Sequence, residues 1–328
     1  MKKRLLNYNF ILFLLVCILV GVISAGKKSE QESMFIHVGI AVYNINDTYM
    51  QNYLEQLLNE LDRYDTSEKK ILYEVFDAEG NLNRQQKQLQ YMCSQNFDIL
   101  LLNLVKPTAA AGILNEASSL NLPVILFNRE IDTKDLTISN AIWYVGTDAK
   151  VAGALQGEML TGAWVKHKEE MDQNKNGKLD YVLVEGEDNH FDTIRRTNGF
   201  MENSRNIDLN QLENISADWQ RTLAYNEYSK LGQTIIDDTE AIICHNDDMA
   251  LGIYDYYSSN DLEIPVIIGI NNNLEMNEKI ESKEIYGTVD INTEEQITYI
   301  CNIVYSILEK KTEVLEKVWY SKPHAVIQ

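Results

Sequence analysis

A polar loop at residues 172–180 carries the most explicit chemistry in the chain. Oxygen-bearing side chains stand at its first, third, fifth and ninth positions and glycine at its sixth, as in the first part of an EF-hand calcium loop: Asp172, Asn174, Asn176, Asp180 and Gly177. Lys178, at the seventh position, would contribute only its backbone carbonyl oxygen. The twelfth position, a bidentate glutamate in an EF-hand, is Leu183. The spacing therefore predicts either a structural calcium site completed by a distant carboxylate or a polar turn without metal.

Further polar and aromatic side chains follow directly after apolar runs. They lie in the segments 42–50, 127–130, 144–148, 186–196 and 246–250. Taken singly, these residues have structural explanations, because Asp47, Asp148 and Asp247 would cap helices. Trp219 would pack in a core, and His190 would be a solvated loop residue. Their common position at the ends of predicted strands favours a binding site instead.

The positions of these segments in the fold are set by the strands and helices that alternate along the chain. Strand-length apolar runs at 35–43, 71–76, 98–104 and 123–128 alternate with helical patterns, and the series restarts at 180–186, 209–215, 240–244, 265–270 and 285–289. Such a succession implies parallel sheets with helices on both faces. We predict an α/β fold of two doubly wound parallel-sheet lobes. A cleft between them would collect the carboxyl ends of strands, where such sheets bind ligands.

The N-terminus has the pattern of an export signal. Lys2, Lys3 and Arg4 precede an uncharged apolar run that ends in small residues near position 26. We predict that residues 1–26 form a signal peptide. A retained N-terminal anchor is the alternative, because the run of about 17 residues is near the lower limit for a membrane span. In both cases the body of the protein lies outside the cytoplasm.

Composition narrows the class of function. The net charge of −20 argues against nucleic-acid binding, which needs clustered lysine and arginine. Beyond residue 26, the cysteines are Cys93, Cys244 and Cys301. An odd number in apolar patterns predicts buried thiols rather than a disulfide framework.

Together with the calcium-like loop, the strand-end segments resemble the galactose/glucose-binding proteins of the periplasmic binding protein superfamily. The resemblance runs collinearly from about Ile36 to Tyr320. It implies the type I fold of that superfamily, with two lobes joined by a hinge near Thr147, Thr293 and Lys322. The N-terminal lobe would contain 35–146 plus about 293–321, and the C-terminal lobe 147–292 plus about 322–328.

The resemblance also implies which residues would bind the sugar. A monosaccharide would be held by polar side chains and sandwiched between two aromatic rings, Tyr49 and Trp219. The matching polar residues are Asp47, Asn128, His190, Asp192, Arg196, Asn246 and Asn271. Carboxylate, amide and guanidinium groups suit sugar hydroxyls, which both donate and accept. The family completes its calcium loop with a remote glutamate, which matches Glu240.

Two positions depart from the family pattern. Asn271 stands where the family usually has aspartate, and Ile291 where it has a ligand asparagine. Asn271 can still bond hydroxyl groups, without the strength of a charged partner. Ile291 cannot, although Asp290 or Asn292 would replace it after a small shift in register. These departures leave the preferred hexose open.

By this resemblance, the chain is a monomeric sugar-binding protein that serves an ABC importer and is not an enzyme. The alternative is a membrane-anchored sugar sensor that signals through a histidine kinase or a chemoreceptor. Asp47 and Asp192 would be the carboxylate pair of a glycoside-cleaving enzyme, but no nucleophile–base constellation accompanies them. A repressor with the same core would need a DNA-binding segment where this chain has an export signal.

Overall fold

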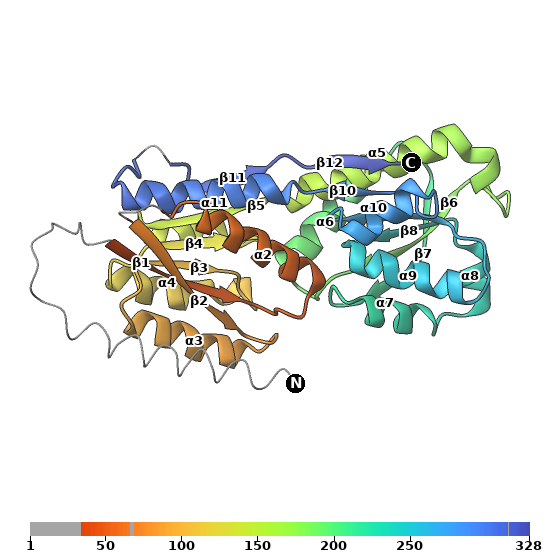
Figure 1. Cartoon of the computed structure of the whole chain (residues 1–328). Helices are drawn as coiled ribbons and strands as arrows, with labels where there is room; N and C mark the ends of the chain where they lie inside the picture. Colours follow the sequence, from red (N-terminus) through yellow and green to blue (C-terminus); the bar gives the residue numbers. More distant parts are fainter. Residues whose placement is uncertain (1–33, 66–68, 314) are drawn as a thin grey trace, which may run out of the picture. The chain divides into compact units, whose positions relative to one another are not determined.

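The two predicted series of strands form two separate six-stranded sheets (Figure 1). The computed structural model describes residues 34–65, 69–313 and 315–328, of which Phe35–Gln328 form one compact unit. The predicted signal peptide or anchor at 1–26 lies outside the described residues. Among the helices that the structure describes, none has the length and apolar character needed to cross a membrane.

The first sheet combines strands from the N-terminal half with one strand from near the C-terminus. Its order is β11-β5-β4-β3-β1-β2. The strands are β1 (Met34–Val42), β2 (Lys69–Asp77), β3 (Ile99–Leu102), β4 (Val124–Phe127), β5 (Ile142–Thr147) and β11 (Val318–Ser321). The pairs β1–β3, β3–β4, β4–β5 and β5–β11 are parallel. The carboxyl ends of these strands therefore meet at one edge of the sheet.

The second sheet has the order β12-β10-β9-β8-β6-β7. Its strands are β6 (Leu179–Glu185), β7 (Leu209–Ser216), β8 (Ala241–Cys244), β9 (Val266–Ile270), β10 (Gly287–Asp290) and β12 (His324–Ile327). Neighbouring pairs are parallel, except that β12 runs antiparallel to β10 at the edge. The predicted α/β fold with two doubly wound sheets is confirmed.

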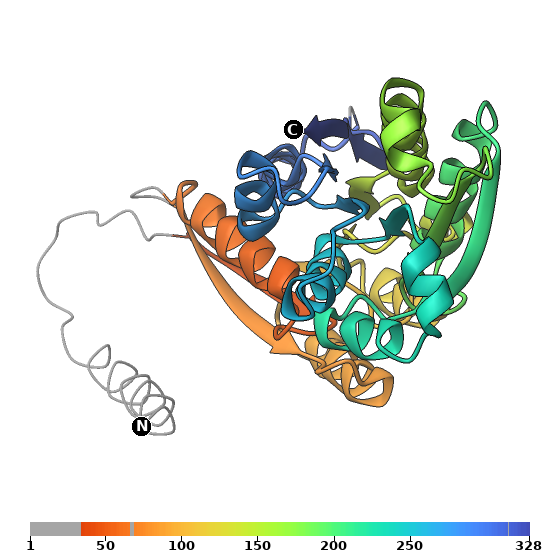
Figure 2. The ribbon, with the colours of Figure 1, turned by 90° about the vertical axis from the view of Figure 1, so that its right-hand side faces the viewer.

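Helices cover both faces of each sheet. The first sheet is flanked by α2 (Thr48–Asp62), α3 (Leu82–Ser94), α4 (Ala110–Ser119) and α11 (Thr293–Leu308). Among these, α2 and α11 lie side by side (Figures 1 and 2). The second sheet is flanked by α5 (Ala149–Met171), α6 (Phe191–Asn203), α7 (Arg221–Tyr228), α8 (Gln233–Asp238), α9 (Asp247–Ser259) and α10 (Leu274–Glu281). Strands such as β3 and β8 are buried along their whole length, as expected for parallel strands covered on both faces.

The chain passes between the two sheets three times, and the three passages are bonded to one another. The Thr147 hydroxyl contacts both the carbonyl oxygen of Ile291, at 3.0 Å, and the hydroxyl of Ser321, at 2.7 Å. The buried amide of Gln296 donates to all three residues. These residues mark the passages after β5, after β10 and after β11, where the resemblance predicts a hinge.

Three elements differ from the sequence prediction. The apolar pattern predicts one helix at 219–236, but two are present. Helix α7 begins only at Arg221, after positive φ angles of 47° at Asp218 and 67° at Trp219, and Gly232 caps the start of α8. The pattern predicts a helix at 149–167, but α5 continues to Met171, with non-helical angles at His167. Strand β12 was not predicted, since a four-residue strand after a proline carries little pattern.

Candidate functional site

One cavity collects side chains from the carboxyl ends of strands in both sheets. Its empty volume is about 410 Å³, including the open mouth. The nine residues that the resemblance assigns to a sugar all line it: Asp47, Tyr49, Asn128, His190, Asp192, Arg196, Trp219, Asn246 and Asn271. Residues distant in sequence meet here because parallel strands end at the same edge of each sheet.

Several of these residues also hold the local backbone. Asp47 caps α2 by accepting the Met50 amide at 2.8 Å, and Asn246 caps α9 by accepting the Met249 amide at 2.9 Å. Asn246 also donates to the carbonyl oxygen of Trp219 at 2.9 Å. The capping that sequence suggested for Asp47 is therefore present together with its place in the cavity.

A positive φ angle at Trp219 and the absence of a side chain at Gly186 place the Trp219 indole in the cavity. Its φ of 67° turns the residue out of the helix that follows. The indole lies against Gly186, where a Cβ atom would meet the ring at 2.2 Å. The guanidinium carbon of Arg196 lies 5.4 Å from the indole ring centre, within the range of a cation–π contact.

His190 is neutral and directs a donor into the cavity. Burial, with a smaller contribution from Arg129, lowers the pKa of His190 to about 3. Its Nδ1 accepts the Asp192 backbone amide at 3.1 Å and so caps α6. A neutral imidazole that accepts at Nδ1 carries its proton on Nε2. That Nε2 is buried and has no partner among the described residues.

Asp192 and Arg196 bring opposite charges to the same cavity wall. Burial raises the pKa of Asp192, and Arg196 and Arg129 oppose that shift. Burial lowers the pKa of Arg196, and the charge of Asp192 opposes that shift. Each residue is 8% exposed. In each case the opposite charge of the other side chain works against the effect of burial.

Two lining residues were missing from the sequence prediction, Tyr43 and Arg129. The Arg129 guanidinium stacks on the Tyr43 ring at 3.8 Å, and the Tyr43 hydroxyl donates to Asp47. Tyr43 directly follows β1, and Arg129 directly follows Asn128. Their positions next to strand ends were the available signal.

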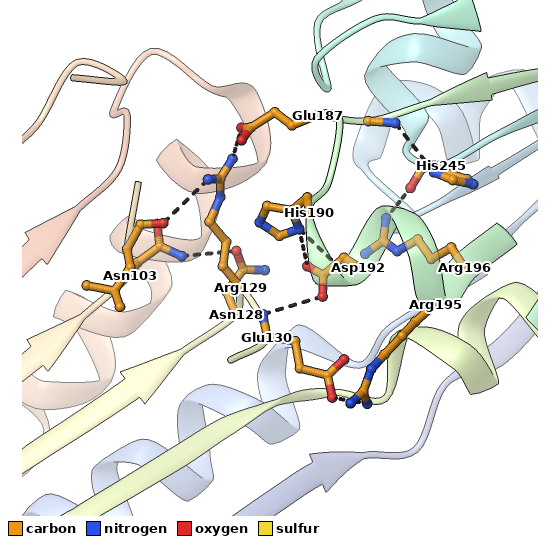
Figure 3. Close-up of polar contacts among 12 residues, drawn as sticks. Asn103, Asn128, Arg129, Glu130, Glu187, His190, Asp192, Arg195, Arg196 and His245 are labelled. Carbon is orange, nitrogen blue, oxygen red and sulfur yellow. Dashed lines mark hydrogen bonds and ion pairs between the residues drawn. The ribbon is translucent and has the colours of Figure 1, made fainter. Parts of the chain in front are cut away.

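Charged contacts connect the two lobes beside the cavity (Figure 3). Arg129, after β4, pairs with Glu187, after β6. Glu130 pairs with Arg195 of α6, and its backbone amide donates to Asp192 at 3.4 Å. Both pairs join an element of the first sheet to an element of the second.

The two residues that depart from the family pattern lie in different places. Asn271 lines the cavity, with a φ of 130°. Ile291 is buried in the core and does not line it. The suggested replacements were wrong, since neither Asp290 nor Asn292 lines the cavity. Asp290 instead accepts from the Asn272 amide at 3.0 Å and from the Asn292 backbone at 2.6 Å.

In the loop between α5 and β6, several residues of the predicted calcium set are hydrogen-bonded to one another or to the loop backbone. The Glu240 carboxylate joins both ends of the loop by accepting the backbone amides of Gln173 and Asp180, each at 3.0 Å. The side-chain amides of Asn174 and Asn176 each lie 2.6 Å from the Asp180 carboxylate.

The backbone of this loop is tightly turned. Gly177 has a φ of 79°, and its amide donates to Asp172. Within 34–65, 69–313 and 315–328, no three His, Cys, Asp or Glu side chains are grouped as a metal site by themselves. A cation here would therefore also need the amide oxygens and the Lys178 carbonyl oxygen.

Comparisons with known proteins connect this architecture to a family. Residues 38–312 match the periplasmic binding protein domain. The chain is 28% identical over 307 residues to the D-galactose/methyl-galactoside binding periplasmic protein MglB of Haemophilus influenzae, covering 93% of this chain and 91% of that protein.

Solved structures show the same fold. A periplasmic solute-binding protein of an ABC transporter from Actinobacillus succinogenes, with bound D-allose, has a TM-score of 0.75 at 17% identity, covering 89% of this chain and 97% of its own. The fructose-binding periplasmic domain of a hybrid two-component system has a TM-score of 0.73 at 20% identity, covering 89% and 91%. The fold is that of type I periplasmic binding proteins, which bind solutes and are not enzymes. Because the matched domain spans most of its length, the chain belongs to the periplasmic binding protein family.

Proposed function

We propose that this protein clamps a free hexose, similar to galactose or glucose, between its two lobes outside the cytoplasm and delivers it to an ABC importer. The observation that carries the proposal is a set of buried nitrogen atoms without partners in the cavity. They are Nε2 of His190, Nε1 of Trp219 and Nε of Arg196, none of which bonds to a described residue. Buried donors cost free energy unless they are bonded, so a ligand rich in hydroxyl groups would satisfy them.

The charges of the cavity favour a neutral ligand. Two carboxylates, Asp47 and Asp192, are matched by two guanidinium groups, Arg129 and Arg196, and His190 is neutral. A phosphate or a carboxylate on the ligand would upset this balance. Tyr49 and Trp219 supply flat apolar surfaces for the C–H faces of a sugar ring.

The similar proteins support a sugar as the ligand, but they do not identify which sugar this protein binds. The Haemophilus influenzae relative binds galactose and methyl-galactoside, and the Actinobacillus succinogenes protein holds D-allose. Ile291 cannot supply the hydrogen bond that the family has at its position. We therefore expect affinity for galactose or glucose to be lower than a full set of ligands would give, by about 1–3 kcal/mol for each unpaired hydroxyl.

Calorimetric titration of the purified protein with hexoses and pentoses in calcium-containing buffer tests the proposal. We expect saturable binding of one hexose, abolished in Trp219→Ala and in Asp192→Ala. Asp237→Ala is the control, because Asp237 is exposed on α8, outside the cavity. If the unaltered protein binds no sugar, the proposal is wrong.

A sugar sensor is the second candidate function. The likeness to a periplasmic domain of a two-component system favours it, although at 20% identity that likeness concerns the fold. Sequencing the N-terminus of the protein purified from its host distinguishes delivery to an importer from sensing. Cleavage near residue 26 supports delivery to an importer, and retention of the apolar segment supports an anchored sensor.

We further propose that the loop after α5 binds one structural calcium ion. Asp172, Asn174, Asn176, Asp180, Glu240 and the carbonyl oxygen of Lys178 are all oxygen donors, which suit calcium. Like charges also crowd here: burial raises the pKa of Glu240, and Asp180 and Asp172 add to the shift. A cation would relieve that repulsion.

Thermal unfolding with and without a chelator tests the calcium site. At calcium 100-fold above its dissociation constant, we expect about 2.7 kcal/mol of extra stability, lost on chelation and restored by calcium. Glu240→Gln should abolish the effect, and Glu169→Gln, on the exposed face of α5, should keep it. A melting temperature that does not respond to the chelator would contradict the site.

A further inference from the structure

The sugar cavity opens into a larger chamber that the proposed function leaves unused. The chamber has an empty volume of about 1840 Å³, including the open solvent at its mouth, against about 410 Å³ for the cavity measured in the same way. Tyr43, Asp47 and Trp219 line both spaces. A ring held in the cavity would therefore have a continuation of the same cleft at one side. We call this space the outer chamber.

The wall of the outer chamber is suited to hydroxyl groups. Amide and hydroxyl side chains approach from both lobes: Asn46, Thr48 and Asn52 from the first, and Gln220, Thr222 and Asn273 from the second. The single basic residue of the described lining is Arg221. It is already bonded to Asp255 at 2.7 and 2.9 Å and to Glu275 at 2.7 and 2.9 Å. The wall thus has no free cation for an acidic group.

Asp248 offers an acceptor to the outer chamber. The residue is 8% exposed and lines the chamber, and no hydrogen bond or ion pair joins its side chain to another described residue. Its charged neighbours are Asp47, Asp247 and Glu275, which repel it, and Arg221, which attracts it. A carboxylate that faces the chamber without a protein donor is free to accept a hydroxyl group of a ligand.

We propose that the outer chamber binds a second sugar unit, so that the protein also accepts a disaccharide whose first ring is the hexose held in the cavity. This inference rests on the proposed function, because the first ring occupies the cavity described above. Trp219 and Tyr43, at the boundary of the two spaces, would contact the linkage between the units. Asp248 would accept a hydroxyl of the second unit.

Calorimetry on the full chain distinguishes this inference from the proposed function. The probes are galactose and glucose beside lactose, melibiose, cellobiose and maltose, which present both anomeric configurations. We expect at least one disaccharide to bind about tenfold or more tightly than its component monosaccharides. If monosaccharides bind and every disaccharide binds more weakly, the second subsite is disproved while the proposed function stands. If no sugar binds, both are disproved.

Two variants locate the subsite. Asp248→Asn keeps the shape of the side chain and should weaken the disaccharide about tenfold while leaving the monosaccharide affinity unchanged. Asn52→Trp, at an exposed position of α2 in the chamber wall, should exclude the second unit by bulk. Asp237→Asn is the matched control. Equal losses for monosaccharide and disaccharide in both variants would overturn the assignment.

Discussion

His190 serves the protein through two different ring nitrogens. Nδ1 accepts the Asp192 amide and caps α6, and Nε2 is a buried donor without a partner among the described residues. Sequence alone left this residue as either a loop histidine or a ligand. The structure gives it a structural role, and the binding role remains a proposal that substitution can isolate.

Asparagine separates the two roles of His190, because it is a good N-cap but has no group in the place of Nε2. We expect His190→Asn to weaken hexose binding about three- to tenfold, as for one lost hydrogen bond. The free energy of unfolding should hardly change. In His190→Ala, unfolding should also become easier by about 1 kcal/mol, because the cap is lost.

Calorimetry and urea denaturation measure the two effects separately. An unchanged hexose affinity in His190→Asn would show that His190 only caps the helix. Loss of stability in that variant would show that asparagine does not replace the cap.

At the scale of elements, the three passages between the sheets are held by one buried amide. Gln296, in the first turn of α11, donates to Thr147 at 2.9 Å, to the Ile291 carbonyl at 2.9 Å and to Ser321 at 3.2 Å. Each of these partners belongs to a different passage. A movement of one lobe against the other would have to preserve or rearrange this cluster.

Gln296→Leu keeps the size of the side chain but removes the donor. We expect the free energy of unfolding to fall by about 1–3 kcal/mol, because three buried oxygen atoms lose a common donor, although they stay bonded to one another. Gln86→Leu, at an exposed position of α3, is the matched control and should change it by less than about 0.5 kcal/mol. Urea denaturation measures both. If Gln296→Leu and the unaltered protein have the same free energy of unfolding, the cluster does not hold the three passages together.

Across the whole molecule, burial keeps several carboxylates protonated to unusually high pH. It raises the pKa of Glu130 to about 7, of Asp248 to about 7 and of Asp247 to about 6. The folded protein thus retains protons that the unfolded chain loses above about pH 4. Folding therefore becomes less favourable as the pH rises from about 4 to about 7. The net charge of −20 acts in the same direction.

We predict that the sugar-free protein is more stable near pH 5 than near pH 8, at constant calcium. Glu130 alone would contribute up to about 3 kcal/mol of the difference, since each pKa unit corresponds to about 1.4 kcal/mol. Glu130→Gln should therefore flatten the profile. Urea denaturation at several pH values measures it, and a stability that rises with pH would contradict the prediction.

The order of strands and helices was predictable because each element carries its own local pattern. Buried parallel strands such as β3 and β8 are continuous apolar runs, and the helix α2 has an apolar face. The strand-end residues were predictable for a related reason, since polar side chains interrupt the apolar pattern just where a parallel strand ends. Strand β12 and the break between α7 and α8 lacked such signals.

The sequence by itself therefore determined the two-sheet architecture, and its resemblance to the galactose/glucose-binding proteins implied nine residues that line one cavity. Only the tertiary structure decided how those side chains are partnered. That Asp248 is buried without a partner, that Arg129 joins Glu187 across the lobes, and that Ile291 belongs to the core instead of the cavity all depend on which distant surfaces meet. Local patterns report the burial of one face of an element, whereas a binding site is made by contacts between elements that are far apart in the chain.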